Sequence, residues 1–232
     1  MNLLLHDQEA GSGEPLLLLH GNGEDGTYFK HQLAYFSSSY HVFAIDTRGH
    51  GQSSRGSCPF TMDQFVEDLK HWMAHRKIKS AIILGFSDGA NVAMKFAFRY
   101  PTHVRALILN GGNYDATGVK RSVQFPIEVG YRLCCFFSRY SSEAQRNMEM
   151  LGLMVNEPRL TPRQLATIEV PVLVIAGTRD MIKRSHTEAL ARAIPRSTLV
   201  FIRGNHFIAR KKPEAFNRAV DDFLRHLQEK EG

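Results

Sequence analysis

Ser87 lies at the centre of a Gly-x-Ser-x-Gly pattern that runs from Gly85 to Gly89. The pattern directly follows an apolar run at residues 81–84, which predicts a strand, and directly precedes a run of helical character that begins at residue 90. A serine on such a tight strand–helix turn presents its hydroxyl above the end of the strand. The flanking glycines fit because a Cβ would collide with neighbouring backbone. The spacing therefore predicts a nucleophilic serine.

A serine hydroxyl is a weak nucleophile at neutral pH, so it needs a base within hydrogen-bond reach and a group that orients the base. Among eleven histidines, His206 directly follows the last predicted strand, and Asp180 follows the strand before it. Because the carboxyl ends of parallel strands share one edge of a sheet, we expect Ser87, Asp180 and His206 to meet there. Asp115, which lies a few residues beyond the end of another predicted strand, is the alternative candidate for the acidic residue that orients the histidine.

Short apolar runs alternate along the chain with longer segments of helical periodicity. The expected strands are residues 16–19, 41–45, 81–84, 104–109, 170–176 and 198–202, and the expected main helices are 28–36, 61–78, 90–99, 185–194 and 213–228. This alternation predicts one α/β domain over residues 1–232, built on a parallel sheet with helices on both faces.

The alternation stops between residues 113 and 168, where no strand-like run occurs. Two or three helices are expected here instead, over the edge of the sheet that carries the serine. We call residues 113–168 the lid segment. Its aromatic residues, which include Phe125, Tyr131, Phe136 and Phe137, suit an aromatic or acyl substrate and equally suit packing of the lid on the core.

These features together resemble the α/β-hydrolase superfamily over nearly the whole chain, and its small esterase, lactonase and carbon–carbon hydrolase branches in particular. The matching residues are His20-Gly21, Asp46-x-Arg48-Gly49-x-Gly51-x-Ser53, the Ser87 turn, Gly177-x-x-Asp180 and Asn205-His206. The resemblance implies a mostly parallel, twisted sheet of about seven strands with a short helical lid. One edge strand of the family is expected to be missing, because only residues 2–6 precede an apparent turn at residues 9–13.

The resemblance also implies roles for residues beside the triad. The oxyanion hole would be the backbone N–H groups of Asn22 and Asp88, and the N–H of Asp88 is a free donor because this residue begins a helix. His20, Asp46 and Arg48 are expected to hold loops in place. The residues expected to contact substrate are Asn22, Asp88, Phe125, Tyr131 and Phe207.

Acidic residues gather near the expected nucleophile. Asp88 flanks Ser87, and Glu24 and Asp25 follow the expected oxyanion loop. An acidic mouth on a chain of net charge +6 would favour substrates that contain an amine or another cation. The alternative is that Asp88 turns away and caps its own helix.

The basic residues, histidines and cysteines indicate which partners, metals and cellular location to expect. The basic residues are dispersed, and no nucleic-acid-binding module is found, so we expect no nucleic-acid partner. His71 and His75 lie four residues apart but lack a third ligand, so no metal site is expected. The three cysteines do not have the spacing of metal ligands. The start of the sequence does not resemble a signal peptide, and no apolar run is long enough for a membrane span. These features favour a cytoplasmic protein with reduced thiols.

We therefore expect a serine hydrolase that cleaves small carboxylic esters, thioesters or lactones through an acyl-enzyme, without a cofactor, as a monomer or homodimer. Hydrolysis of a carbon–carbon bond next to a ketone uses the same triad and is the alternative within enzymes. The alternative from another class is a ligand-binding protein with this fold and little turnover.

Overall fold

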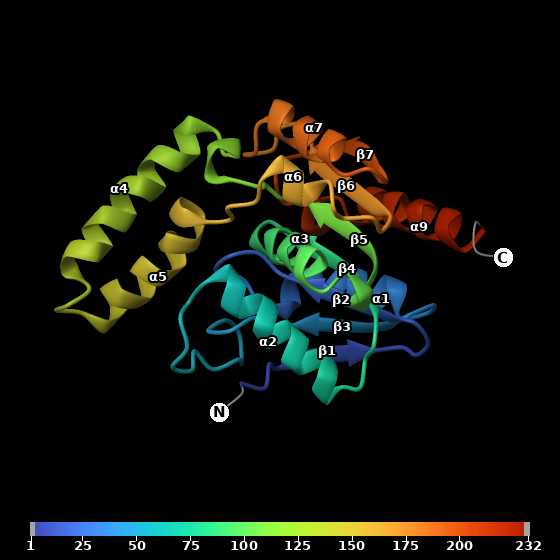
Figure 1. Ribbon diagram of the computed structural model, residues 1–232, viewed down its shortest axis with the longest axis horizontal. Coiled ribbons are helices and arrows are strands. Elements are labelled where there is room, and N and C mark those ends of the chain that lie inside the picture. The colour runs from blue at the N-terminus through green and yellow to red at the C-terminus, as the bar shows by residue number, and fades with distance from the viewer. Residues whose placement is uncertain (1–2, 230–232) are drawn as a thin grey trace.

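The computed structural model describes residues 3–229, which form a seven-stranded sheet in the order β1-β3-β2-β4-β5-β6-β7 (Figure 1). The first and last residues of the predicted domain, 1–2 and 230–232, lie outside this range. The strands are β1 (Asp7–Ala10), β2 (Pro15–Leu19), β3 (His41–Ile45), β4 (Ala81–Phe86), β5 (Val104–Asn110), β6 (Val172–Gly177) and β7 (Ser197–Ile202). Only β1 runs antiparallel to its neighbour, so the predicted fold class is confirmed.

The inner strands are almost entirely apolar because helices cover both faces of the sheet. In β2, Leu17 and Leu19 belong to the core on one face, whereas Leu16 and Leu18 belong to the core on the other. Successive side chains of a strand point to opposite faces, so a strand that is buried on both sides needs apolar residues at every position. The continuous apolar runs in the sequence therefore mark these strands.

Three main helices cover one face and four helical segments cover the other. The first group is α2 (Met62–His75), α3 (Asp88–Arg99) and α7 (Arg184–Ala193), and the second is η1 (Gly26–Phe29), α1 (Lys30–Phe36), α8 (Ile208–Lys211) and α9 (Pro213–Glu229). A short turn of helix, η2 (Pro101–His103), connects α3 to β5. Thr61 caps α2 by accepting a hydrogen bond from the Gln64 N–H at 3.2 Å.

Two local expectations need correction. The prediction of a turn from residue 9 was wrong, because residues up to Ala10 pair with β3 as the edge strand β1. The turn begins instead at Gly11, whose φ of 81° is readily adopted by glycine. Helix α2 ends at His75 rather than at residue 78, because Lys77 has a φ of 58° and leaves the helical conformation.

The lid segment contains η3 (Ala116–Gly118), α4 (Arg121–Phe137), α5 (Ser142–Asn156) and α6 (Pro162–Leu165). Helices α4 and α5 pack together as a hairpin that projects from the body, whereas α6 returns to pack against α3 and α7 (Figure 1). Helix α6 begins with a capping box between Thr161 and Gln164. Across residues 3–229, no helix combines the length and apolar character needed to cross a membrane.

Candidate active site

Ser87 occupies a strained turn between β4 and α3, with a φ of 53° and a ψ of −118°. The two glycines of the pattern make this turn possible. A Cβ on Gly85 would lie 2.4 Å from the carbonyl oxygen of Gly89, and a Cβ on Gly89 would lie 2.0 Å from the carbonyl oxygen of Leu19. Positive φ is costly for serine, and such strain persists where close packing leaves the backbone no alternative.

The structure brings the three predicted triad residues into one chain of hydrogen bonds. His206 Nε2 lies 3.0 Å from Ser87 Oγ, and His206 Nδ1 lies 2.7 Å from Asp180 Oδ1. Because a carboxylate only accepts hydrogen bonds, the Nδ1–H donates to Asp180, and Nε2 accepts from the serine hydroxyl. The three side chains come from the ends of β4, β6 and β7, which share one edge of the sheet.

Asp180, rather than the rival Asp115, is the acid in contact with His206. Burial raises the pKa of Asp180, but the hydrogen bond and charge of His206, with the N–H groups of Ile182 and Gly177, outweigh burial and hold that pKa below its usual value. Asp180 is thus an anion at neutral pH. Asp115 instead accepts a hydrogen bond from the Thr117 N–H at 2.7 Å and caps η3.

The predicted oxyanion loop passes directly beside the nucleophile. A Cβ added to Gly21 would lie 3.2 Å from the Cβ of Ser87, so a larger residue there would crowd the site. Asn22 follows Gly21, and Asp88 is the first residue of α3, which gives its backbone N–H no partner within the helix. Asn22 and Asp88 line the same small cavity.

Two buried histidines hold this loop in place. His20 Nδ1–H donates to the Gly21 carbonyl oxygen at 2.7 Å, and His20 Nε2 accepts from the Thr47 N–H at 3.0 Å. Burial lowers the pKa of His20 to about 4, so the neutral ring required by these bonds is the stable form. His50 Nε2 accepts from the Gly23 N–H at 3.2 Å, and burial lowers its pKa as well. Sequence reasoning predicted the supporting role of His20 but missed His50, which lies within the quoted Asp46–Ser53 motif.

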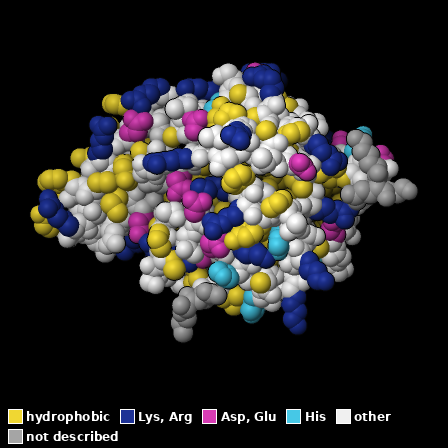
Figure 2. Space-filling model, viewed as in Figure 1, with side chains coloured by type: hydrophobic (Ala, Val, Ile, Leu, Met, Phe, Trp, Pro, Cys, Tyr) yellow, Lys and Arg dark blue, Asp and Glu magenta, His cyan; other side chains and the backbone are white. Residues whose placement is uncertain are grey.

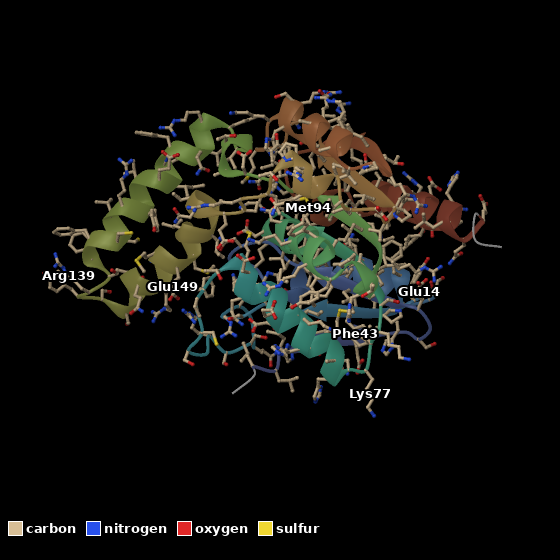
Figure 3. The ribbon with its side chains drawn as sticks, viewed as in Figure 1. Glu14, Phe43, Lys77, Met94, Arg139 and Glu149 are labelled. Atoms are coloured by element: carbon tan, nitrogen blue, oxygen red, sulfur yellow. The ribbon has the colours of Figure 1, made fainter. Side chains whose placement is uncertain are left out.

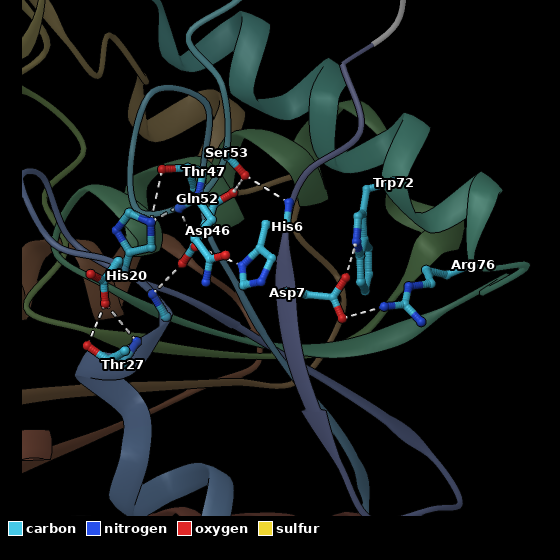
Figure 4. Close-up of polar contacts among 12 residues, drawn as sticks. His6, Asp7, His20, Thr27, Asp46, Thr47, Gln52, Ser53, Trp72 and Arg76 are labelled. Atoms are coloured by element: carbon cyan, nitrogen blue, oxygen red, sulfur yellow. Dashed lines mark hydrogen bonds and ion pairs between the residues drawn. The ribbon is translucent and has the colours of Figure 1, made fainter.

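Asp46 and Arg48 fix the neighbouring loop, as expected. Asp46 Oδ1 accepts from the Gly26 N–H at 2.7 Å, and Oδ2 accepts from the Gln52 N–H at 2.9 Å (Figure 4). Arg48 forms a two-pronged ion pair with Asp68, with N–O distances of 2.7 and 2.6 Å. Because both of these side chains are buried, the pair ties the loop firmly to α2.

Two of the three acidic residues near the mouth, Asp88 and Glu24, are partly buried, and each has one carboxylate oxygen that is shielded from solvent. Asp88 accepts a hydrogen bond from Asn91 at 3.3 Å, whereas its other oxygen, Oδ2, is buried without a hydrogen-bond partner among the described residues. Burial raises the pKa of Asp88 to about 6. Burial likewise raises the pKa of Glu24 to about 7, against the opposing charge of Arg210. Asp25 instead caps η1.

The predicted substrate-contacting residues lie in different places. Phe207 is next to the triad, with its ring centroid 5.5 Å from that of His206. The Asn22 side chain donates to the Met150 carbonyl oxygen of α5 at 2.7 Å, so it joins the oxyanion loop to the lid segment. Tyr131 packs on α5 at Gly152. Phe125 is 55% exposed on the outer side of α4, so the structure does not place it as a lining residue.

The described residues contain no group of three or more His, Cys, Asp or Glu side chains arranged to hold a metal ion. His71 and His75 both lie on α2, which covers one face of the sheet, whereas the triad lies at the ends of the strands. The groups that the structure brings together at the ends of the strands are the serine, the histidine and the aspartate, with the backbone of the Gly21–Asn22 loop beside them.

Residues 14–133, just over half of the chain, match the family model described as alpha/beta hydrolase fold. Serine hydrolase BPHL of Mus musculus is 28% identical over 95% of this chain and 82% of its own length. 3-Oxoadipate enol-lactonase 2 of Acinetobacter baylyi is 26% identical over 91% of this chain and 89% of its own. A solved meta-cleavage product hydrolase from Pseudomonas fluorescens is 24% identical with a TM-score of 0.78, covering 97% of this chain and 95% of its own. The chain therefore belongs to the α/β-hydrolase fold family and is a hydrolase.

Proposed function

We propose that this hydrolase cleaves small carboxylic esters, thioesters or lactones through an acyl-enzyme on Ser87. The observation that carries the proposal is the unbroken hydrogen-bond chain from Asp180 through His206 to Ser87, beside two backbone donors. The names of the curated relatives, a serine hydrolase and an enol-lactonase, support the same class of reaction.

Acylation follows from the atoms in contact. Ser87 Oγ adds to the substrate carbonyl carbon while its proton moves to His206 Nε2, 3.0 Å away. The carbonyl oxygen becomes an oxyanion, which the N–H groups of Asn22 and Asp88 bind. When the carbonyl re-forms, the bond to the leaving oxygen or sulfur breaks, and His206 gives its proton to that atom. Asp180 stabilises the imidazolium between these two proton transfers.

Deacylation repeats these steps with water. A water molecule loses a proton to His206 Nε2 and adds to the acyl carbon, which forms a second oxyanion in the same two N–H groups. The bond to Ser87 Oγ then breaks, Oγ regains the proton from His206, and the carboxylic acid leaves. Loss of either oxyanion donor typically costs about 10²–10³ in rate, so the position of the Gly21–Asn22 loop contributes to catalysis alongside the triad.

A positively charged group on the substrate is the refinement that Asp88 favours. Its Oδ2 atom is buried without a hydrogen-bond partner among the described residues, one residue from the nucleophile. An ammonium group bound beside Asp88 would attract this carboxylate through its charge and favour the ionised form. Amino-acyl esters should then have higher kcat/KM than neutral esters of the same shape, and equal values for the two would remove the idea.

The deciding experiment compares the wild type, Ser87→Ala and the control Ser38→Ala, which changes an exposed serine on the molecular surface. p-Nitrophenyl acetate and butyrate, a thioester and a lactone are the substrates. We expect turnover in the wild type and the control but not in Ser87→Ala, with one acyl group trapped on Ser87 in quenched mass spectra.

Equal turnover in all three proteins would refute the proposal. If the wild type cleaves none of these substrates but hydrolyses a carbon–carbon bond next to a ketone, the alternative reaction is correct. If it binds such ligands without turnover, the ligand-binding alternative is correct.

A further inference from the structure

Helix α4 presents an apolar stripe on the side that faces away from α5. The stripe consists of Phe125, Val129, Leu133, Phe136, Phe137 and Tyr140, and each of these side chains is 40–73% exposed. Spacings of three and four residues place them along one side of the helix and the turn that follows it. Isolated exposed apolar residues are common, but a continuous patch of this kind marks an interaction surface.

The opposite side of α4 packs against α5. A Cβ on Gly130 would lie 3.4 Å from Leu151 of α5, and a Cβ on Gly152 of α5 would lie 3.3 Å from Tyr131. Helix α4 therefore contacts α5 closely through one face, which leaves the apolar stripe without a partner among the described residues.

Helix α5 makes contacts that attach the α4–α5 hairpin to the rest of the molecule. Arg55 forms an ion pair with Glu149 at 2.5 Å, and Asn22 donates to the Met150 carbonyl oxygen at 2.7 Å. Figure 3 shows Glu149 on α5 and Arg139 at the far end of the hairpin. Helix α4 is thus the outer helix, and its stripe faces solvent.

Arginines form a row along one edge of the stripe. Arg121 and Arg132 are separated by eleven residues, close to three helical turns, so they lie above one another, and Arg139 follows in the turn after α4. Arg121 and Arg139 also pack over rings of the stripe, at 5.2 Å from Phe125 and 5.0 Å from Tyr140. Figure 2 shows hydrophobic and basic side chains together on this projecting part of the molecule.

We propose that the apolar stripe of α4 binds the surface of an anionic lipid bilayer. A helix with aromatic and aliphatic residues on one side and arginines at the edge lies in the bilayer interface, with its apolar side among the acyl chains and its arginines at the phosphates. The sequence of α4 contains one acid, Glu128, and it is already paired with Arg121 at 2.8 Å. A second copy of this chain would bring two rows of arginines together with no further acid on α4 to pair with them, so charge favours lipid.

The test is co-sedimentation of the full chain with vesicles. One set contains phosphatidylcholine with about one third phosphatidylglycerol, and the other contains phosphatidylcholine alone. We expect the wild type to bind the anionic vesicles more tightly, and added salt to weaken that binding. Leu133→Ser with Tyr140→Ser should weaken it at least about tenfold. Arg132→Gln with Arg139→Gln should weaken it about fivefold for each arginine removed.

Two controls match these changes elsewhere on the surface. Phe98→Ser removes an exposed aromatic from α3, and Arg218→Gln removes an exposed arginine from α9. Both should bind vesicles like the wild type, and circular dichroism melting should show all variants folded.

Three results would overturn the proposal: a wild type that does not sediment with anionic vesicles, stripe variants that bind like the wild type, or controls that lose binding equally. Sedimentation velocity tests the alternative that the stripe binds a second copy of this chain. A wild-type dimer that Leu133→Ser with Tyr140→Ser converts to a monomer, without vesicle binding, assigns the stripe to a second copy of the chain.

Discussion

Replacing Asp180 by asparagine removes the negative charge next to His206 while keeping the shape of the side chain. Asp180 Oδ1 accepts from both His206 Nδ1–H and the Ile182 N–H, at 2.7 and 3.0 Å. An asparagine is expected to place its carbonyl oxygen there, because its NH₂ group would otherwise face these two donors instead of the single, longer contact with the Gly177 N–H at 3.4 Å. His206 therefore keeps its tautomer in the variant, and what is lost is the electrostatic stabilisation of the imidazolium.

The size of that loss follows from Coulomb's law. Opposite unit charges whose centres are about 4 Å apart interact by about 4 kcal/mol at an effective dielectric constant of about 20. Since about 1.36 kcal/mol corresponds to a factor of ten, kcat/KM should fall by about 10³. A variant that forced the wrong tautomer would lose about 10⁴.

The assay is ester hydrolysis by the wild type, Asp180→Asn and Asp115→Asn. Asp115→Asn is the matched control, because Asp115 caps η3 and makes no contact with His206, so its activity should stay within about twofold of the wild type. The reasoning is refuted if Asp180→Asn keeps more than about a tenth of the wild-type activity, or if Asp115→Asn is the variant that loses it.

Three further predictions concern stability. Asp68→Ala leaves Arg48 buried without its carboxylate and should cost about 3–5 kcal/mol in urea unfolding, and a cost under about 1 kcal/mol contradicts this. Asp88→Asn should stabilise the protein at pH 8 by on the order of 2–3 kcal/mol and not at pH 4. Burial raises the pKa of Asp88 in the folded protein to about 6 from 3.8, so the stability of the wild type falls as pH rises between these values. If Asp88→Asn stabilises the protein equally at pH 4 and pH 8, this reasoning is wrong. Gly89→Ala forces a Cβ to within 2.0 Å of the Leu19 carbonyl oxygen, so melting temperature and esterase activity should both drop, and an unchanged crystal structure with full activity would contradict it.

The strand positions and the meeting of the triad could be predicted from the sequence for a simple physical reason. Strands that are buried on both faces must be apolar throughout, and parallel strands bring the residues that follow them to one edge. Strand β1 was missed because it lies at the edge and half-exposed, so its sequence Asp-Gln-Glu-Ala lacks any apolar signal. Its pairing with β3 arises from tertiary contacts, including the bond from Trp72 Nε1–H to Asp7 at 3.0 Å (Figure 4).

The direction of the α4 side chains could not be predicted from the sequence. This helix has apolar residues around most of its circumference, so periodicity alone does not tell which face packs on α5. Phe125 was expected at the substrate and lies in solvent, whereas Tyr131, six residues later, packs against α5. Gly130 and Gly152 lie on the two faces that meet, where a Cβ would be 3.4 Å from Leu151 and 3.3 Å from Tyr131, and neither contact can be read from periodicity.

Asn22 connects the lid segment to the loop beside Ser87. Its side chain holds the Met150 carbonyl oxygen of α5, and its backbone lies in the loop next to the nucleophile. Any outward displacement of α5 that moves Met150 away must first break this bond, which frees the side chain of the residue whose N–H we propose as an oxyanion donor. Under the proposed mechanism, the position of α5 and the position of one oxyanion donor are therefore coupled through a single residue, so a change in the lid segment would also be felt at the reacting carbonyl.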